Sequence, residues 1–389
     1  MPIGFLEGFF YLQIGWISLP YLSYPLGVVV LSRLVPGSQG RKREEGKMSG
    51  LKISYILACH NEEAVIQERI RNIQSQAEFH AQGELIVAVD GSTDATYSLA
   101  QALTAPNLQV LNLARLGKAR TQNIAIEKSR GDIVLITDAD TKFAPAFTRF
   151  MVEELLRDPA AGAVVGCLRW EDNRRSTGVM KRLQFFVENH IRAAESRLGV
   201  LTSGSGASMA FWKKYYLPME KETDDTDTLV PLDMVRQNRK VRYCAGALAW
   251  ETPFLNTQDE MRAKIRGVSK TLTMVFGRYS WRFWIRHPGV ACQFWLKHLG
   301  RWLFLPVWIC AWLTGVFLVL QGARSFPFLF VASSFFLGGI LLASAVSRKL
   351  GGVQAWTGLP VDLFCAHLGM MLGVLRFLRK KSQGLWSPR

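Results

Sequence analysis

The sequence lacks the cysteine patterns of secreted or zinc-binding proteins. Its six cysteines are scattered over 389 residues, and no two of them form a Cys-x-x-Cys pair. Internal repeats are absent as well. A disulfide framework or a structural zinc site is therefore not expected, and the soluble part of the chain is predicted to lie in a reducing compartment.

Charge is missing from three long stretches. No Asp, Glu, Lys or Arg occurs at residues 8–32, 302–323 or 325–347. Each stretch is long enough to cross about 30 Å of hydrocarbon as a helix, which needs roughly 20 residues. The first stretch has no Ala-x-Ala-like cleavage site and is too long for a signal peptide. We therefore expect a membrane protein with an uncleaved N-terminal anchor and C-terminal transmembrane helices.

The charge that is present is mostly positive. The chain has 47 Lys and Arg against 31 Asp and Glu, which gives a formal net charge of +16. Such an excess fits nucleic acid, anionic lipid headgroups or a phosphorylated substrate as the partner. Basic clusters follow the apolar stretches, at 41–43, 348–349 and 379–381. Because this is the positive-inside pattern, nucleic acid is disfavoured, and a multi-pass protein of the inner or plasma membrane with a cytoplasmic soluble domain is expected.

Composition divides the chain into six zones. They are an N-terminal transmembrane helix (1–35), a linker (36–50), a soluble domain (51–270), interfacial amphipathic helices (271–301), C-terminal transmembrane helices (302–378) and a basic tail (379–389). The last apolar segment, 353–375, either crosses the membrane or stays interfacial. A crossing would leave Arg376 and Arg379 outside, against the charge rule. It is nevertheless the expectation, because the segment is long enough to cross.

Short β-rich runs alternate with helical patterns at the start of the soluble domain. Strands are predicted at 51–59, 83–91, 107–113 and 131–140, and helices at 62–76, 94–103 and 117–128. This alternation indicates βαβ units, and hence a Rossmann-like α/β domain with a mainly parallel sheet. Ligands of such sheets bind beyond the carboxyl ends of the strands.

Three of the predicted strands end in polar, acid-bearing loops. These loops contain His60-Asn61-Glu62, Asp90 and Asp138-Ala139-Asp140. Two carboxylates one residue apart can hold Mg²⁺ or Mn²⁺, hard cations that share oxygen ligands with substrate phosphates. The alternative is an exposed turn with helix-capping acids. Convergence of three such endings at one edge of the sheet favours a site.

Three segments together resemble a known family. They are CHNEEAVIQERIRNI (59–73), VAVDGSTDAT (87–96) and LNLARLGKARTQNIAIEKSRGDIVLITDAD (111–140). In combination, and over roughly residues 51–270, they resemble family 2 glycosyltransferases with a GT-A fold, the inverting, nucleotide-sugar-dependent class of bacterial polysaccharide and glycolipid synthases. The resemblance implies that the loop 60–62, Asp90 and Lys118 line the nucleotide pocket. It also implies that Asp138 and Asp140 hold Mg²⁺ or Mn²⁺ and the sugar diphosphate.

A glycosyltransferase also needs a base. The attacking hydroxyl must lose its proton to a positioned carboxylate, while a metal neutralises the leaving diphosphate. The acid-rich segment 221–251 is the expected source. Matching NRKVRY to the family, with Asn238 where the family prefers Gly, selects Asp227, whereas the acid pair alone would select Asp225. The alternative is an acidic helix N-terminus.

Two further segments match the family less completely. Gly204, Ser205 and Gly206 would let the backbone approach the sugar closely, or they form a plain turn. The segment QDEMRAKIRGV stands where processive members have Gln-x-x-Arg-Trp, and it contains no Trp. Its Arg262 and Arg266 either pair with the diphosphate or belong to a basic helix on the membrane face. Long-chain processive synthesis is therefore in doubt.

The predicted function is a membrane-bound, inverting glycosyltransferase. It would move a sugar from a nucleotide-sugar, expected to be a UDP-sugar, to a saccharide or lipid-linked acceptor in polysaccharide or glycolipid synthesis. Its expected partners are the donor, the acceptor and membrane lipid, and a homo-oligomer would be compatible with it. The alternative is a non-catalytic nucleotide-binding membrane scaffold of a polysaccharide assembly system. Acids at all of the expected positions favour the enzyme.

Overall fold

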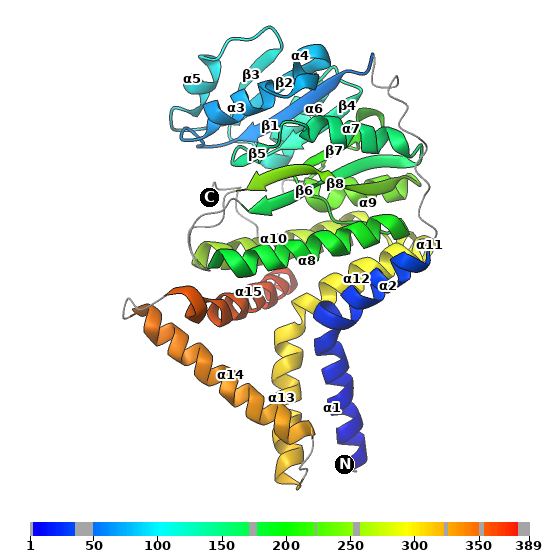
Figure 1. Cartoon of the computed structure of the whole chain (residues 1–389), viewed down its shortest axis with the longest axis vertical. Coiled ribbons are helices and arrows are strands. Elements are labelled where there is room, and N and C mark those ends of the chain that lie inside the picture. Colours follow the sequence, from blue (N-terminus) through cyan, green and yellow to red (C-terminus); the bar gives the residue numbers. More distant parts are fainter. Residues whose placement is uncertain are drawn as a thin grey trace.

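The computed structural model describes residues 3–35, 50–170, 177–221, 224–251, 257–322, 326–349 and 354–379. The predicted linker and the predicted basic tail lie almost entirely outside these residues. Figure 1 shows the α/β part at one end of the molecule, and a stem of helices that extends from its other end.

The four predicted strands are confirmed and lie side by side. They are β1 (Ile53–Cys59), β2 (Gly83–Asp90), β3 (Leu108–Leu113) and β4 (Ile133–Thr137). All of their pairings are parallel, in the order β3-β2-β1-β4. Because parallel strands end at the same edge, the loops after β1, β2 and β4 meet there, as the sequence predicts.

Four more strands extend the sheet to eight. They are β5 (Thr141–Phe143), β6 (Ala161–Trp170), β7 (Met209–Trp212) and β8 (Lys240–Glu251). The full order is β3-β2-β1-β4-β7-β6-β8-β5. β7 runs antiparallel to β4 and β6, and β5 runs antiparallel to β8, whereas β6 and β8 are parallel. The sheet is therefore mixed, with a parallel half that holds the predicted site.

Helices cover both faces of the sheet. They are α3 (Ile66–Gln74), α4 (Ala77–Gln82), α5 (Thr96–Gln101), α6 (Lys118–Lys128), α7 (Phe147–Arg157), α8 (Thr177–Leu198) and α9 (Thr226–Arg236). Alternate residues of β1 point to opposite faces, so Tyr55 and Leu57 pack in one hydrophobic core while Ile56 packs in another. Both faces are apolar, which explains the nearly continuous hydrophobic runs of the central strands.

A long apolar helix opens the chain. It consists of α1 (Ile3–Ser18), a π-helical turn (Leu19–Ser23) and α2 (Tyr24–Leu34), and Pro20 lies within the turn. In the described part of the chain this 32-residue helix is the one helix that is, by itself, long and apolar enough to cross a membrane. Its large apolar side chains are mostly exposed, for example Leu12 and Leu34.

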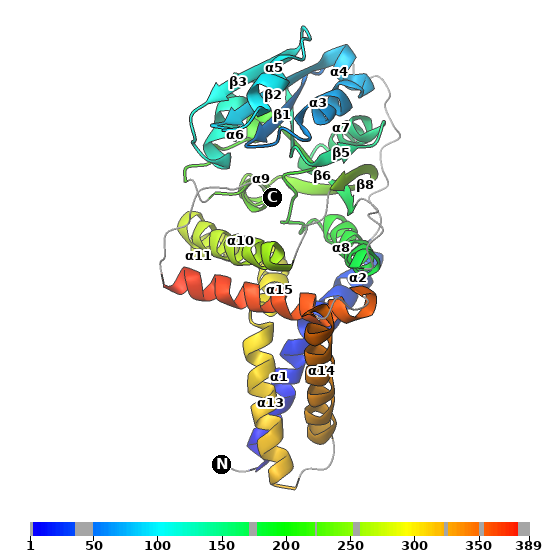
Figure 2. The same ribbon diagram turned by 90° about the vertical axis from the view of Figure 1, so that its left-hand side faces the viewer.

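The C-terminal transmembrane helices are not confirmed. Helices α12 (Pro288–Trp302) and α13 (Phe304–Leu320) reach the required length only as a pair that is bent by 61°. The described apolar part of α14 (Phe326–Lys349) is shorter than a membrane span. In Figure 2, α13 and α14 extend beside α1, away from the sheet.

A layer of helices separates the sheet from the stem. It includes α10 (Thr257–Arg278), α11 (Trp281–Arg286), α12 and α15 (Gln354–Leu378). The predicted boundary at 270/271 falls inside α10. The segment expected to make a last crossing forms α15, which lies across the stem helices and packs along α10 (Figure 2). Its apolar length is therefore used in packing against α10, and the structure does not support a crossing there.

Candidate active site

The first turn of α9 and a glycine loop (residues 202–206) form one side of the site. The side chain of Asp225 caps α9 by accepting a hydrogen bond from the Asp227 N–H at 2.9 Å. The Gly206 N–H donates to the Asp227 carboxylate, and the Gly204 N–H donates to the Asp227 carbonyl oxygen at 2.7 Å. A Cβ on Gly206 would lie 2.8 Å from Asp227 Oδ1, so glycine permits this approach.

Lys118, the first residue of α6, forms the centre of the site. Its Nζ lies 2.6 Å from Oδ1 of Asp138, which follows β4. The same Nζ lies 3.7 Å from where a Cβ on Gly206 would stand, next to the Asp227 carboxylate. The structure thus brings Asp138, Lys118 and Asp227 together from three segments that are distant in sequence. Asp140 lies two residues beyond Asp138 and is partly exposed.

The charges of this cluster perturb one another. Burial, and next the like charge of Asp225, raise the pKa of Asp227 to about 7, although Lys118 and the Gly206 N–H oppose the shift. Burial alone would lower the pKa of Lys118, but attraction to Asp138 and Asp227 outweighs it and raises that pKa. A carboxyl group that titrates near neutrality therefore lies beside a permanently charged ammonium group. This is the property expected of a general base.

Sequence reasoning missed Arg69. This residue of α3 is 2% exposed, and its guanidinium donates to the carbonyl oxygen of Asp138 at 3.2 Å and to the hydroxyl of Thr137. Burial lowers the pKa of Arg69 to about 9, while Asp138 and Asp140 oppose that shift. Arg69 thus holds the turn that presents both acids. One feature of the sequence indicates that Arg69 is buried. It lies on the same face of the helix as the apolar residues Ile66, Ile70 and Ile73.

The carboxylate of Asp90 is bonded to its own chain. It is fully buried, and its carboxylate accepts hydrogen bonds from the N–H groups of Leu116 and Gly117, from the Thr121 hydroxyl and from Arg115. Asp90 thus anchors the loop that precedes Lys118. The predicted contact between this side chain and a nucleotide stays a prediction.

The loop after β1 is likewise held by its own chain. His60 Nδ1 lies 2.8 Å from the Asp90 carbonyl oxygen, and the N–H groups of Asn61 and Glu62 donate to Ser92 and Thr96. These contacts hold the β1 and β2 loops together at the predicted edge.

The two predicted phosphate-binding arginines are on α10. Arg262 is 72% exposed and forms an ion pair with Asp259 of the same helix at 3.6 Å. Arg266 lies one turn further, on the part of α10 that packs along α15. The predicted pairing of Arg262 and Arg266 with the diphosphate stays a prediction.

The donor set that the sequence predicts for a metal consists of Asp138 and Asp140. Within the described ranges, no group of three or more His, Cys, Asp or Glu side chains could hold a metal ion. Two partly exposed carboxylates on one turn nevertheless fit Mg²⁺ or Mn²⁺, since these ions take their remaining oxygen ligands from substrate phosphates and water.

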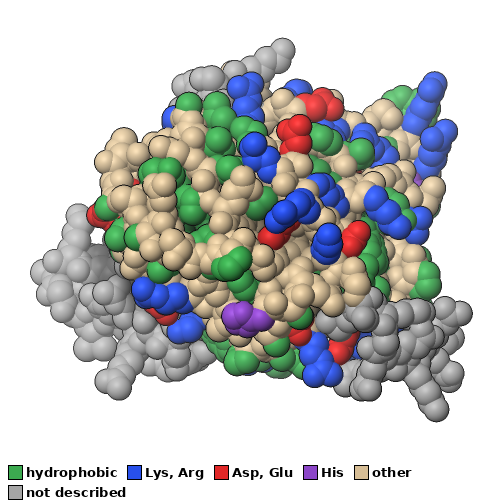
Figure 3. All heavy atoms as spheres, turned by 90° about the horizontal axis from the view of Figure 1, so that it is seen from above, with side chains coloured by type: hydrophobic (Ala, Val, Ile, Leu, Met, Phe, Trp, Pro, Cys, Tyr) green, Lys and Arg blue, Asp and Glu red, His purple; other side chains and the backbone are tan. Residues whose placement is uncertain are grey.

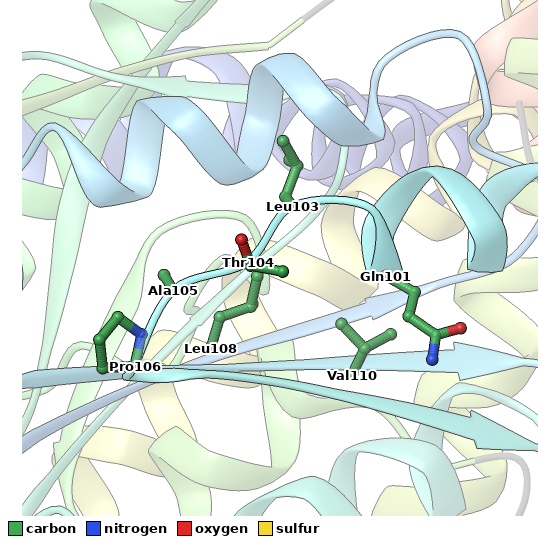
Figure 4. A pocket seen from close by; sticks show the side chains of 7 residues that line it. All are labelled: Gln101, Leu103, Thr104, Ala105, Pro106, Leu108 and Val110. Atoms are coloured by element: carbon green, nitrogen blue, oxygen red, sulfur yellow. The ribbon is translucent and has the colours of Figure 1, made fainter.

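A hollow of about 430 Å³ lies elsewhere, between α5 and the edge strand β3 (Figure 4). Its lining residues are Gln101, Leu103, Thr104, Ala105, Pro106, Leu108 and Val110. None of these side chains is ionisable, so none can act as an acid, a base or a charged metal ligand. This hollow is therefore not the candidate active site.

Residues 54–217 match the family model described as glycosyl transferase family 2. Among curated proteins, the chain is 24% identical over 204 residues to the poly-β-1,6-N-acetyl-D-glucosamine synthase of Staphylococcus aureus (strain COL). It is 25% identical over 217 residues to the synthase of that name from Staphylococcus epidermidis. These alignments cover 51% and 54% of this chain, and the chain spans about half the length of the relatives (49% and 51%).

Among solved structures, the chain is similar to the mannosyltransferase PcManGT from Pyrobaculum calidifontis in complex with GDP-Man and Mn²⁺. The match covers 96% of this chain and 99% of that one, with a TM-score of 0.66 and 21% identity. At this identity the likeness shows a shared fold. The fold resemblance includes the GT-A part expected from the sequence.

Proposed function

Since residues 54–217 make this chain a member of glycosyl transferase family 2, and hence a glycosyltransferase, we propose that it transfers a sugar with inversion from a nucleotide-sugar to a saccharide or lipid-linked acceptor at a membrane. The observation that supports this most is the position of Lys118 between Asp138 and Asp227. One acid lies on the predicted donor side and the other on the predicted acceptor side.

On the donor side, negative charge develops on the nucleoside diphosphate as it leaves. Lys118 places an ammonium group at hydrogen-bond distance from Asp138. This group can donate to a phosphate oxygen that takes the place of the carboxylate, and it can stabilise the charge that develops there. Asp138 and Asp140 would hold Mg²⁺ or Mn²⁺, which neutralises diphosphate charge when bound. Arg69 fixes the turn of the two acids from the buried side.

On the acceptor side, Asp227 takes the proton from the attacking hydroxyl. A carboxyl group with a pKa of about 7 is a far better proton acceptor than an ordinary aspartate, and it is still largely ionised slightly above neutral pH. The acceptor oxygen forms its bond to the anomeric carbon as the bond to the diphosphate breaks on the opposite face. A single displacement of this kind inverts the anomeric configuration.

Attachment to a membrane is part of the proposal. The N-terminal helix supplies one apolar span, and α13 and α14 extend alongside it. On α11, Trp281 and Ile285 are 68% and 67% exposed beside Arg282 and Arg286. Aromatic, aliphatic and basic side chains on one short helix suit the headgroup region of a bilayer. A lipid-linked acceptor would then reach the site from the stem side.

Positive charge is not confined to the helices that lie next to the stem. Figure 3 shows the face farthest from it, where Lys and Arg side chains are scattered widely and acids are few. This distribution supports an anionic donor as a second partner for the excess charge, beside lipid headgroups.

The number of sugars added is proposed to be small. The curated relatives are named as synthases of a polymer, but the matched segment spans about half of their length. In this chain, the segment that aligns with Gln-x-x-Arg-Trp lacks the Trp, and it lies on α10 with an exposed Arg262. We therefore favour a single or short-chain addition over long-chain processive synthesis.

Nucleotide release tests the proposal. Detergent-purified protein is incubated with Mg²⁺ or Mn²⁺, a lipid extract as acceptor, and UDP- and GDP-sugars that include UDP-N-acetylglucosamine and GDP-mannose. We expect release of nucleotide with one donor, and its loss in Asp227→Asn while nucleotide binding is retained. Unchanged release in Asp227→Asn would reject Asp227 as the base. Binding of nucleotide without any transfer would favour the scaffold hypothesis for this chain.

A further inference from the structure

The glycine loop that holds Asp227 is itself held by a helix of the membrane-proximal layer. Thr202 is fully buried, and its hydroxyl donates to Oε1 of Gln293 on α12. Gln293 is 2% exposed. The loop therefore has a side-chain bond to α12 two residues before Gly204, whose N–H donates to Asp227.

Gln293 is in turn fixed by a buried network. Its Nε2 donates to Oε1 of Glu195 on α8 at 3.0 Å. The same Glu195 oxygen accepts from Lys297 of α12 at 3.2 Å and from the hydroxyl of Tyr24 on α2 at 2.6 Å. These hydrogen bonds define which atom of the Gln293 amide faces Thr202, because only the NH₂ group can donate to the Glu195 carboxylate.

Hydrogen bonds and packing thus connect the long N-terminal helix to the glycine loop. Figure 1 shows α2 and α12 side by side beneath α8. Tyr24 and Val28 of α2 pack against Ile191 and Ala194 of α8, which places the apolar contact next to the polar network. Any other arrangement of this buried network would leave a polar group without a hydrogen bond, which costs free energy. The network therefore has one favoured arrangement.

We propose that Thr202 and Gln293 are positioning residues, which fix the glycine loop, and through it Asp227, to the membrane-proximal helices α2 and α12. The inference rests on the proposed function of Asp227 as the base. It adds that the geometry of the base depends on how the N-terminal helix packs against α8. Neither Thr202 nor Gln293 is proposed to touch a substrate. A displacement of about 1 Å at a reacting group can cost roughly a hundredfold in rate.

The test uses the isosteric pair Thr202→Val and Thr202→Ser in the full-length protein. Valine keeps the shape and loses the hydroxyl, whereas serine keeps it. We expect Thr202→Val to lower kcat about tenfold, with a smaller change in donor KM, and Thr202→Ser to restore most of the rate. Hydrogen exchange of the amides at 200–207 should be about tenfold faster in Thr202→Val than in the wild type.

Two further variants keep the test decisive. Tyr24→Phe removes the outermost hydrogen bond without touching the loop, and it should speed exchange at 200–207 in the same direction. Thr148→Val removes a buried hydroxyl that bonds Tyr55 on another part of the domain, and it should leave that exchange unchanged. Wild-type exchange at 200–207 in a folded Thr202→Val protein would overturn the proposal, as would an unchanged kcat. If Asp227→Asn keeps full transfer activity, the proposed role of Asp227 as the base fails, while the exchange data still report on the anchoring.

Discussion

The titration of Asp227 gives the site a pH dependence at the residue scale. Its pKa of about 7 is raised by burial and by Asp225. A protonated carboxyl cannot accept a proton, so kcat/KM should rise with pH through about 7 and fall about tenfold per pH unit well below it. Asp227→Asn should lower kcat/KM by roughly 10²- to 10⁴-fold above pH 7 and abolish this acid limb, so that the difference from the wild type shrinks at lower pH. Initial rates of nucleotide release from pH 5 to 9 measure both effects.

The neighbours of Asp227 should move this acid limb in opposite directions. Asp225→Asn removes a like charge but keeps a side chain that can cap α9, so the limb should shift to lower pH. Lys118→Gln removes an opposite charge, so the limb should shift to higher pH by roughly one unit. The same rate profiles test this pair. Complete inactivity of Asp225→Asn, with an active Asp227→Asn protein, would instead identify Asp225 as the base.

What the sequence reveals about a residue depends on how local its chemistry is. Asp138 and Asp140 could be predicted because they end an apolar strand, and the register of NRKVRY singled out Asp227. Arg69 was missed, because its place on the apolar face of α3 does not reveal its partners Thr137 and Asp138, which lie almost 70 residues away. Asp90 was predicted at the right edge, but only the structure shows that its carboxylate is already used by Arg115 and by the N–H groups of its own loop.

At the scale of elements, the end of α9 tests the register that selects Asp227. Asn238 has a φ of 57°, its N–H donates to Val235, and the next N–H donates to Met234, which is a Schellman motif. Glycine, the residue that the family prefers, adopts this conformation freely, whereas a β-branched residue does not. Asn238→Gly should keep or raise the melting temperature, and Asn238→Val should lower stability by about 1–2 kcal/mol. Thermal unfolding in detergent measures both, and a stable Asn238→Val protein would contradict the motif.

The contact between α10 and α15 is a second test at this scale. A Cβ on Gly373 would lie 2.8 Å from Cβ of Val268 and 2.9 Å from the Ile265 carbonyl oxygen. Gly373→Ala should therefore destabilise the packing by about 1–3 kcal/mol. The matched control is Gly267→Ala on α10, where a Cβ would meet nothing within 4 Å and should stabilise the helix by about 0.5–1 kcal/mol. Equal effects of the two substitutions on thermal unfolding would contradict this contact.

Elements of the parallel half could be predicted because their pattern is local. Strands β1, β2 and β4 are apolar runs bounded by loops, β3 is a short run that contains Gln109 and Asn112, and α6 begins at the predicted Gly117–Lys118 step. The antiparallel insertion of β7 between β4 and β6 depends on pairing across about 75 residues, and no local pattern encodes it. The boundary predicted at 270/271 fell inside α10 for a different reason, because the helix continues without a break to Arg278.

At the scale of the whole molecule, hydropathy and structure disagree about the C-terminal segment. An apolar run of sufficient length predicts a crossing, but hydropathy does not distinguish lipid from an apolar protein partner. In α15, Met370, Val374 and Phe377 pack against Val268, Leu272 and Trp302 instead. The basic residues Arg376 and Arg379 then stay on the side of the α/β domain, which satisfies the charge rule that a crossing would break.

This arrangement predicts where the two termini lie. If the N-terminal helix crosses once, and α13 and α14 cross as a hairpin, a C-terminal reporter should be cytoplasmic together with the α/β domain, and an N-terminal tag should be outside. Protease protection of the N-terminal tag, and activity of a C-terminal reporter that folds only in the cytoplasm, measure this in intact cells and in opened vesicles. A C-terminal reporter found outside would mean that 353–375 crosses after all. The packing of Gly369 and Gly373 on α10 would then have to be given up, and with it the expected loss of stability in Gly373→Ala, so the two measurements check each other.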